Sequence, residues 1–413
     1  MIKTITRCRV CGNDNLISVM ALGEQALTGV FPKSRTEKIT TGPIELVQCV
    51  GVDKCGLVQL KQSYDLSEMY GMNYGYRSGL NASMVTHLHS KVEKILASDV
   101  LNPGDLIIDI GSNDGTTLRA YPVKKYQLVG VDPTGVKFSS YYPPEIELIV
   151  DFFSAEVVKS ALSGKTAKVI TSFSMFYDLE DPVAFAREVE RALDEEGVWI
   201  FEQSYLPAML RTNSFDTICH EHLEFYSLKQ INWIASRAGL KVLDVEFNNI
   251  NGGSFSITAA KSSSKRQVNT EWLDKIIDEE NALGLGTTEA FDEFKGRVEE
   301  SRQALLKFLN EAKSSGKTVC GLGASTKGNV LLQYFGIDAS LLSVIGEVNE
   351  DKFGSFTPGT LIPLAAEADV LNSNPDYLLV LPWHFRNFFL ALPSMKGRKL
   401  VFPLPQFEII ECR

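Results

Sequence analysis

The chain has 413 residues, 44% of them hydrophobic and 22% charged. This is the composition of a folded globular protein, and it excludes disordered, collagen-like and disulfide-dense classes. Its 41 basic and 51 acidic side chains give a net charge of −10. Without a basic block to match phosphate polymers or anionic lipids, we expect neither nucleic acid nor a membrane as a partner. The start of the chain does not read as a signal peptide and no apolar run approaches ~20 residues, so we expect a cytoplasmic protein.

Four of the seven cysteines, Cys8, Cys11, Cys49 and Cys55, fall near the start of the chain. Cys8 and Cys11 have the C-x2-C spacing of a zinc knuckle, whereas five residues separate Cys49 from Cys55. In a reducing compartment such thiols bind metal more often than they form disulfides. Four thiolates complete a tetrahedral shell and leave no position for a substrate, so we predict a structural zinc. The alternative is that Cys49 and Cys55 only pack and no metal binds.

Apolar runs that alternate with helical segments predict parallel sheets with crossover helices. The strands predicted for a first sheet lie at 105–111, 126–132, 146–151, 167–173 and 197–203, and 255–261 can close it. A polar stretch at 262–271 and a charged helix over 286–316 precede four further strands, at 318–326, 341–349, 377–383 and 399–405. The predicted fold class is therefore α/β, with a small cysteine-bearing module at 1–70 and two Rossmann-like domains at 71–262 and 263–413.

The first predicted strand ends near Asp109 and runs into a glycine turn, Gly111-Ser112-Asn113-Asp114-Gly115. Such a turn lets the backbone approach a ligand closely. The pattern is not G-x-G-x-x-G, and an acidic strand end suits a cation or a hydroxyl better than a phosphate. Asp132, at the end of the next strand, is placed to accept ribose hydroxyls.

Further along the same edge, Asp151 and Phe152 offer a polar contact and an aromatic wall for an adenine, and Ser174 lies at the same rim. A ligand with a ribose, an adenine and a positive centre is S-adenosylmethionine. The predicted cofactor-binding residues are Asp109, Gly111, Asn113, Gly115, Asp132, Asp151, Phe152 and Ser174. A nicotinamide-binding domain of unusual sequence, and a turn without a ligand, are the alternatives.

Two of the five histidines lie in Cys219-His220-Glu221-His222. The spacing is not the H-E-x-x-H of zinc proteases, although Cys219 keeps a metal among the alternatives. A histidine with a pKa of about 6.5 can take up a proton at neutral pH. We therefore predict that His222 is a general base whose ring Glu221 orients or stabilises. For each histidine the alternative is a structural residue.

A second glycine turn, residues 321–328, again follows a predicted strand. Lys327 and the amides at the start of the following helix predict an anion site, although this is not a Walker A loop. Asn349 and Lys352 follow the next strand and His384 follows another, where ligands enter such sheets. The alternative is a domain that only packs.

Taken together, these motifs resemble the S-adenosylmethionine-dependent sugar C-methyltransferases, which methylate C-3 of a nucleotide-linked 4-keto-6-deoxysugar. The resemblance spans essentially the whole chain and also rests on the stretches 74–79 (YGYRSG) and 252–254 (GGS). It implies a zinc-binding module, a Rossmann-like methyltransferase domain, and a C-terminal Rossmann-like domain that helps to hold the nucleotide-linked keto-deoxysugar.

The resemblance implies that His222 removes the proton beside the ketone, assisted by Tyr76 and Glu221. In the family a tyrosine stands two residues before the glutamate, where this chain has Cys219. The expected substrate-binding residues are Tyr74, Arg77, Ser78, Cys219, His220, Lys327, Asn349, Lys352 and His384. An O- or N-methyltransferase on a sugar or small metabolite, and a non-catalytic interaction module, are the alternative functions. We expect a monomer or a small homo-oligomer.

Overall fold

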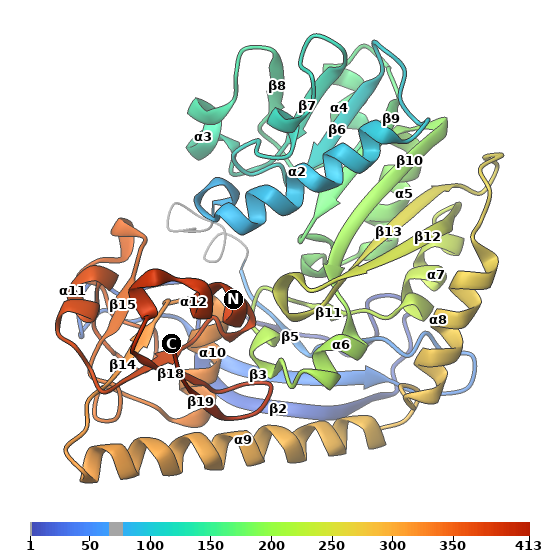
Figure 1. Ribbon diagram of the computed structural model, residues 1–413. Helices are drawn as coiled ribbons and strands as arrows, with labels where there is room; N and C mark the ends of the chain where they lie inside the picture. Colours follow the sequence, from blue (N-terminus) through green and yellow to red (C-terminus); the bar gives the residue numbers. More distant parts are fainter. Residues whose placement is uncertain (1, 66–76) are drawn as a thin grey trace.

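Four β-sheets organise the computed structural model, which describes residues 2–65 and 77–413 (Figure 1). The predicted site residues Tyr74 and Tyr76 lie outside the described residues. The mixed α/β fold class is confirmed, whereas the division of the chain after residues 70 and 262 stays a prediction. Within the described ranges, no helix combines the length and the apolar content that crossing a bilayer requires.

The N-terminal segment builds an antiparallel sheet of order β11-β4-β3-β2. Its strands are β2 (Leu16–Ala26), β3 (Thr41–Cys49), β4 (Val58–Leu60) and β11 (Glu224–Phe225), and a two-stranded sheet joins β1 (Lys3–Thr4) to β5 (Gln62–Ser63). The pairing of β2 with β3 contains two register shifts. These breaks in the alternation of apolar and polar residues explain why the sequence pattern did not predict the two strands.

The seven-stranded sheet has the order β12-β13-β10-β9-β6-β7-β8. Its strands from β10 to β8 are parallel to their neighbours, and β13 is antiparallel to both β10 and β12. The bounds are β6 (Leu106–Ile110), β7 (Gln127–Val131), β8 (Ile146–Ile149), β9 (Ala167–Phe173), β10 (Leu193–Ser204), β12 (Leu240–Asn248) and β13 (Ser254–Lys261). All but β12, whose apolar residues are interrupted by acidic ones, overlap the predicted strands.

Helices cover both faces of this sheet (Figure 1). On one face α4 (Ala155–Ala161), α5 (Pro182–Ala192) and α7 (Leu228–Arg237) bury the apolar side chains of alternate strand positions such as Ile108 and Phe201. On the other face α2 (Ala82–Ala97) packs over Ile107, Leu128 and Val169. The short α3 (Gly135–Phe138) follows β7, and α8 (Thr270–Ala282) packs against α7 and β12.

The C-terminal sheet has the order β16-β15-β14-β17-β18-β19 and is parallel except for β19. Its elements are β14 (Val319–Leu322), α10 (Thr326–Phe335), β15 (Ile345–Glu347), β16 (Leu364–Ala366), α11 (Glu367–Asn372), β17 (Tyr377–Val380), α12 (Arg386–Ala391), β18 (Lys399–Phe402) and β19 (Glu408–Glu411). The four predicted strands are present, and β16 and β19 extend the sheet at its two edges.

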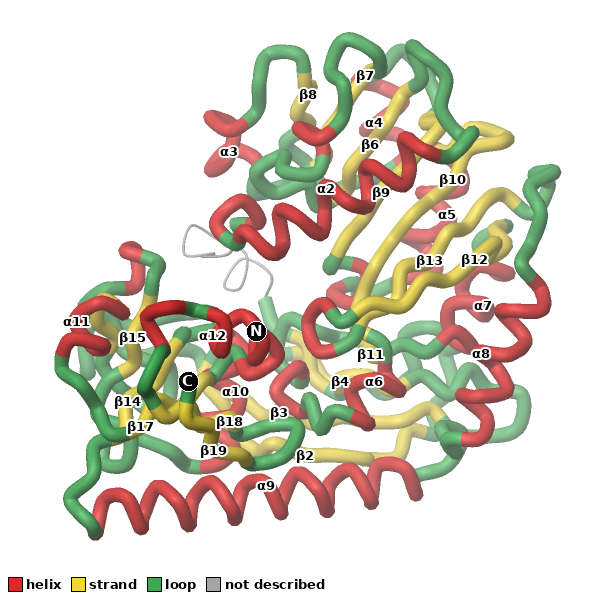
Figure 2. The backbone as a smooth tube through the Cα atoms, in the orientation of Figure 1, coloured by secondary structure: helices red, strands yellow, loops and turns green. Residues whose placement is uncertain are grey.

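One apolar core joins the N-terminal sheet to the C-terminal sheet. The long helix α9 (Glu289–Ser314) runs along β2, as Figure 2 shows, and α6 (Leu206–Arg211) packs on it. Between these layers lie the buried side chains of Phe215, Ile218, Cys219 and Leu223. Most of residues 212–223 are therefore buried inside the protein, while Glu221 and His222 of the histidine–glutamate motif are half-buried.

Short 3-10 turns shape the loops around this core. They are η1 (Ser78–Leu80), η2 (Leu118–Ala120), η3 (Ser139–Tyr141), η4 (Phe176–Asp178), η5 (Phe215–Thr217), η6 (Ile250–Gly252), η7 (Glu350–Lys352), η8 (Trp383–Phe385) and η9 (Pro393–Met395).

A buried arginine connects the first cysteine pair to the rest of the fold. The Arg9 side chain is 2% exposed, and its Nε lies 3.7 Å from Oε1 of Glu224, whose side chain is fully buried. Its Nη1 also donates to the carbonyl of Leu60, 2.6 Å away. Since Glu224 lies on β11, the Arg9–Glu224 pair ties the cysteine turn to the strand that directly follows the histidine–glutamate motif.

Replacing Arg9 with methionine should leave the buried Glu224 carboxylate without its charged partner and lower the free energy of unfolding by about 3–5 kcal/mol. The double variant R9M/E224Q also removes the unpaired charge of Glu224 and should recover part of that loss. Thermal unfolding midpoints measure both effects, with the exposed Arg7→Met as the matched control. An R9M midpoint equal to that of R7M would contradict the role given to the pair.

Candidate active site and zinc centre

The four N-terminal cysteines converge on one point. Their sulfur atoms all lie within 4.8 Å of one another, with 3.4 Å between Cys8 and Cys55 and 3.5 Å between Cys11 and Cys49. Zn–S bonds of about 2.3 Å place tetrahedral sulfur pairs about 3.8 Å apart, close to these separations. The amide of Asn13 donates to the Cys49 sulfur at 3.3 Å. The four thiols therefore fit a closed structural zinc site, as predicted, and the five-residue insertion does not prevent it.

The carboxyl ends of β6, β7 and β9 bring the first glycine turn and its acidic neighbours together. Asp109 is buried and accepts the hydroxyl hydrogen of Thr171 at 2.5 Å, and burial raises the pKa of its carboxyl to about 7. Gly111 and Gly115 have φ angles of +68° and +73°. A side chain at Gly111 would be strained and would lie 3.3 Å from Met175. Both positions therefore need glycine.

Asp132 holds the glycine turn in shape. One carboxylate oxygen accepts the Asn113 N–H at 2.8 Å, and the other accepts the N–H and hydroxyl of Thr134 at 2.7 and 2.6 Å. A carboxylate has about four acceptor positions, so about one stays available for a ribose hydroxyl. Asn113 itself adopts a φ of +51°, which asparagine tolerates better than most residues.

Tyr142 packs directly on this turn and was not predicted. Its hydroxyl lies 2.8 Å from Oγ of Ser112 and 3.0 Å from the Asn113 carbonyl. Its ring would be 3.1 Å from a Cβ at Gly115. Because Tyr142 belongs to a loop without a motif, no signal in the sequence points to it.

The remaining predicted cofactor residues follow β8 and β9. Phe152 is 64% exposed, and Asp151 beside it is also exposed. Ser174 is half-buried, with a φ of +55°, and its N–H donates to the Glu202 carbonyl at 2.8 Å. These residues lie at the sheet edge that carries the glycine turn, because the strand pairings are parallel.

Residues 77–80 dock onto the glycine turn. The N–H groups of Ser78 and Gly79 donate to the side chains of Asn113 and Asp114, at 3.0 and 3.1 Å. The Arg77 guanidinium stacks 4.6 Å from the ring centre of Tyr141. The structure therefore brings Arg77 and Ser78, expected at the substrate, next to the predicted cofactor residues.

His222 is held by two contacts on the methyltransferase side. Its Nδ1 lies 2.8 Å from the carbonyl of Thr217, and its ring packs against Tyr177 with 4.4 Å between centroids. A carbonyl only accepts, so Nδ1 carries the hydrogen and Nε2 keeps its lone pair. Burial lowers the pKa of this imidazole to about 4, partly opposed by the bond to Thr217, and the charge of Lys327 lowers it further.

Glu221 lies where the three parts of the chain meet. A Cβ at Gly29 would lie 2.7 Å from Oε1 of Glu221 and 3.9 Å from the hydroxyl of Thr326. The Cys219 thiol lies 3.6 Å from the other carboxyl oxygen. Burial raises the pKa of Glu221 to about 7. The carboxyl can therefore act as a hydrogen-bond donor or acceptor near neutral pH.

His220 contacts the N-terminal segment instead. Its Nε2 donates to the Gln25 carbonyl at 3.2 Å, and its ring packs edge-on against Tyr64, 4.5 Å away. It is 1% exposed. The contacts of His220 are those of a structural residue.

The C-terminal residues divide into two groups. Lys327, at the start of α10, donates to the Asn251 carbonyl at 2.8 Å, and its charge acts on His222 and His384. Lys352 instead donates to the carbonyl of Ala324 in the second glycine turn, also at 2.8 Å. Lys327 and His384 therefore lie in the same neighbourhood as His222, the predicted base.

Asn349 and Lys352 organise the second glycine turn together with Glu347. The Glu347 carboxylate accepts the N–H of Ala324 at 3.0 Å and that of Asn349 at 3.0 Å. The Lys352 ammonium also lies 4.7 Å from the ring centre of Phe31. An acid at the end of the second strand therefore braces this turn, as Asp132 braces the first one.

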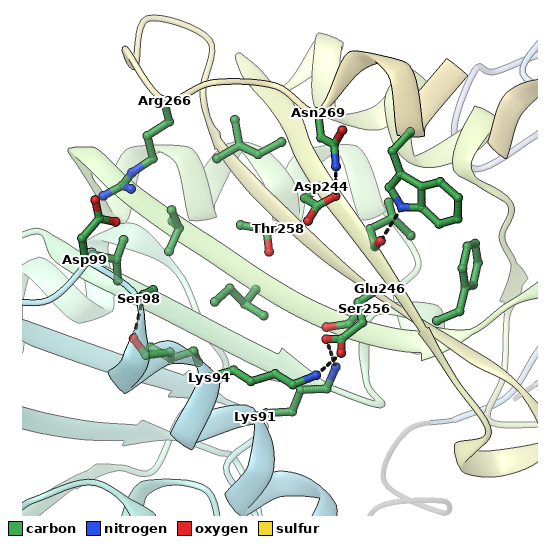
Figure 3. Close-up of a pocket in the computed structure, with 18 residues that line it drawn as sticks. Lys91, Lys94, Ser98, Asp99, Asp244, Glu246, Ser256, Thr258, Arg266 and Asn269 are labelled. Carbon is green, nitrogen blue, oxygen red and sulfur yellow. Dashed lines mark hydrogen bonds and ion pairs between the residues drawn. The ribbon is translucent and has the colours of Figure 1, made fainter. Parts of the chain in front are cut away.

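A groove of about 780 Å³ lies elsewhere, between α2 and the strands β10, β12 and β13 (Figure 3). Lys91 closes one end, pairing with Glu202 at 3.0 Å and Glu246 at 3.1 Å. Of the predicted site residues that the structure describes, none lines this groove.

A seven-stranded sheet with an acid-braced glycine turn at its carboxyl edge, beside a four-thiol centre, defines a zinc-containing S-adenosylmethionine-dependent methyltransferase. The donor set fits the cofactor: carboxylates suit ribose hydroxyls and a sulfonium, and left-handed glycines admit close backbone approach.

Comparisons with known proteins identify the same parts in the same order. A family model described as "Putative zinc binding domain" matches residues 8–70, "Methyltransferase domain" matches 82–245, and "C-methyltransferase C-terminal domain" matches 249–405. The C-methyltransferase NovU of Streptomyces niveus is 27% identical over 418 residues, covering 100% of this chain and 98% of that protein. The chain therefore has the three-part organisation of a zinc-containing, S-adenosylmethionine-dependent C-methyltransferase.

Solved methyltransferase structures are similar to part of the chain. Magnesium protoporphyrin IX methyltransferase of Synechocystis PCC 6803, with bound SAM, is 14% identical with a TM-score of 0.32, covering 43% of this chain and 79% of that one. The CcbJ methyltransferase of Streptomyces caelestis is 11% identical with a TM-score of 0.33, covering 42% of this chain and 89% of that one.

Replacing Cys55 with serine should remove the bound metal, because a hydroxyl does not replace a thiolate in a closed zinc site. We expect elemental analysis to find about one zinc per chain in the wild type and a small fraction of that in C55S. Cys412→Ser, at a cysteine outside the four-thiol group, is the matched control and should keep its zinc. Equal zinc contents in C55S and C412S would refute the assignment.

Proposed function

We propose that this enzyme transfers the methyl group to C-3 of a nucleotide-linked 4-keto-deoxysugar, through an enolate formed when His222 removes the C-3 proton. The observation that carries the proposal is the short contact between Nδ1 of His222 and the Thr217 carbonyl, which fixes the tautomer of the neutral ring. Its Nδ1–H is committed to the Thr217 carbonyl at 2.8 Å, so the Nε2 lone pair is free to accept a proton. A base fixed in one tautomer and one orientation is what proton abstraction beside a ketone requires.

The environment keeps this base neutral. Because burial lowers the pKa of His222 to about 4, the imidazole is unprotonated at every pH well above that value. A histidine of low basicity removes a carbon-bound proton only where the product oxyanion is stabilised.

Two groups supply that stabilisation in our proposal. Lys327 uses one N–H for the Asn251 carbonyl, which leaves two N–H donors for a substrate oxygen. Glu221 has a pKa raised to about 7 by burial and can hold a proton for the same purpose. We propose Tyr76 as the third member of this set, on the ground of the family motif.

The cofactor is held in our proposal by the carboxyl edge of the seven-stranded sheet. The residues are Asp109, Gly111, Asn113, Gly115, Asp132, Asp151, Phe152 and Ser174, with Asp132 directed to the ribose and Phe152 to the adenine. When bound, S-adenosylmethionine supplies the electrophilic methyl group that the activated sugar carbon accepts.

The nucleotide-linked sugar lies between the two Rossmann-like domains in this proposal. Arg77, Ser78 and Tyr74 approach from the cofactor side, and Cys219, Lys327 and His384 line the base side. Asn349 and Lys352, beside the second glycine turn, contribute to the nucleotide end. His220 is assigned a structural role, because Gln25 and Tyr64 occupy its ring.

Incubating the enzyme with a nucleotide-linked 4-keto-6-deoxysugar in D2O, without the methyl donor, should exchange the C-3 proton for deuterium. His222→Ala should lower this exchange, and methyl transfer, by about 10²–10⁴-fold, because the general base is lost. Its affinity for S-adenosylmethionine should stay close to that of the wild type. His89→Ala, on α2, is the matched control. Mass spectrometry of the sugar measures the exchange, and exchange in H222A at the wild-type rate would remove His222 as the base.

The low pKa of His222 also predicts a pH profile. A base whose pKa is lowered is active above that pKa and is lost as the pH falls through it. Since the pKa of Glu221 is near 7, the test uses Glu221→Gln, which removes this carboxyl from the acid limb of kcat that His222 sets. We expect the midpoint of that limb well below the ordinary value of about 6.5. A midpoint at or above that value in E221Q would contradict the neutral, buried base.

A further inference from the structure

Asp216 is a buried carboxylate that no sequence motif singled out. It lies on η5, one residue before the carbonyl that holds His222, and its side chain is inaccessible to solvent. One oxygen accepts the indole N–H of Trp383 at 2.7 Å. The other oxygen has no hydrogen-bond partner among the described residues. Burial raises the pKa of Asp216, and the charge of Lys327 and the Trp383 hydrogen bond oppose this change. A buried carboxylate in this state is stable only near a positive charge.

Lys327 supplies a positive charge in this neighbourhood: its Nζ donates to the Asn251 carbonyl at 2.8 Å, and the next residue, Gly252, lies between Ser214 and Trp383. Lys327 is half-buried, so its ammonium is partly removed from water and is stabilised by an opposite charge close by. Burial lowers the pKa of Lys327, and the Asp216 carboxylate is the first group that opposes this change, followed by the Cys219 thiol. The charge of Lys327 in turn lowers the pKa of both His222 and His384.

The packing places Asp216 across the junction of the two Rossmann-like parts. η5 packs on α10, and η6 packs on η8. Gly252 lies between them: a Cβ there would be 3.0 Å from Oγ of Ser214 and 3.9 Å from Cη2 of Trp383. The Asp216–Trp383 hydrogen bond therefore spans from the methyltransferase side to the C-terminal side, beside the ammonium of Lys327.

We propose that Asp216 is a positioning residue of the active site, whose carboxylate holds Lys327 as an ammonium directed at the oxygen on which charge develops. Asp216 does not touch the substrate in this proposal and acts through Lys327 and Trp383. The proposal rests on the proposed function for the role of that oxygen, and only for that.

The charge balance predicts a specific pH effect. Four titratable side chains influence or face the Lys327 ammonium: Asp216, Cys219, His222 and His384. His222 and His384 are neutral at pH 8, because burial and the Lys327 charge keep their pKa values low. Removing the Asp216 charge therefore lowers the pKa of Lys327 without compensation, and the ammonium is lost at a lower pH.

The test is Asp216→Asn. The amide oxygen can still accept the Trp383 N–H, so the hydrogen bond is kept and only the charge is lost. We expect the alkaline limb of kcat/KM to move down by about one pH unit and kcat/KM at pH 8 to fall about tenfold. Asp376→Asn is the matched control, because Asp376 pairs with Lys317 at 2.8 Å on the exposed surface. D376N should leave the limb in place.

A second readout does not depend on the reaction. Competitive labelling of lysines with a small acylating reagent across pH, followed by peptide mass spectrometry, reports the pKa of Lys327 in the free enzyme. The Lys327 labelling curve should move to lower pH in D216N and stay unchanged in D376N. Unchanged curves and an unchanged limb in D216N would overturn the proposal. If the wild type transfers no methyl to a keto sugar, the proposed function fails while the labelling still decides the role of Asp216.

A double variant covers the case in which D216N does not fold. If D216N unfolds because the Lys327 charge is left unpaired, D216N/K327M should regain the thermal midpoint of Lys327→Met. For folded variants, the loss of kcat in the double variant should equal that in K327M alone, because Asp216 acts through Lys327. A double variant that stays unfolded, or whose losses add, would contradict the proposal.

Discussion

The structure depends on burying a loop, residues 212–223, whose backbone must then find partners inside the protein. Loops normally lie on the surface because their N–H and C=O groups need water. Here the Leu223 N–H donates to the Tyr177 carbonyl at 2.8 Å, and its own carbonyl accepts the Leu60 N–H at the same distance. At the other end, the Asn213 amide donates to the Pro405 carbonyl at 2.8 Å. These partners come from all three parts of the chain, so the loop takes its shape only in the assembled fold.

This constraint gives the histidine–glutamate motif its chemistry. Burial lowers the pKa of His222 and of Lys327 and raises the pKa of Glu221 and of Asp216, and the charges of Lys327 and Asp216 modify these shifts. Electrostatic interactions in such a site are stronger than in water, and the same burial makes an unpaired charge costly. The zinc module contributes here as well, since β11 continues from the motif into the N-terminal sheet and Arg9 pairs with Glu224 on that strand.

Much of the fold could be predicted from the sequence, at those places where a single sequence pattern determines the local structure. The parallel strands read as continuous apolar runs, and the cysteine spacing indicated the four-thiol centre now seen. The order of the motifs also indicated the family. The cofactor and substrate residues follow the same motifs, and their individual roles stay predictions.

The remainder depends on contacts between distant segments, which a single sequence does not display. The pairing of β11 with β4 joins residues more than a hundred positions apart, and Tyr142 contacts the glycine turn from an unremarkable loop. Asp216 lies only a few residues before the predicted base, yet its hydrogen-bond partner, Trp383, lies in the C-terminal part of the chain. For His220 the position in the motif predicted a contact with the substrate, whereas its ring nitrogen bonds the Gln25 carbonyl.

The proposed chemistry requires residue 222 to present a neutral imidazole with its hydrogen on Nδ1. Nitrogen-15 NMR of histidine-labelled enzyme measures this directly, because protonated and unprotonated ring nitrogens have separate chemical shifts and the chain has five histidines, which single substitutions assign. We expect a protonated Nδ1 and an unprotonated Nε2 for this ring from pH 6 to pH 8. An imidazolium at neutral pH, or a ring with its hydrogen on Nε2, would contradict it.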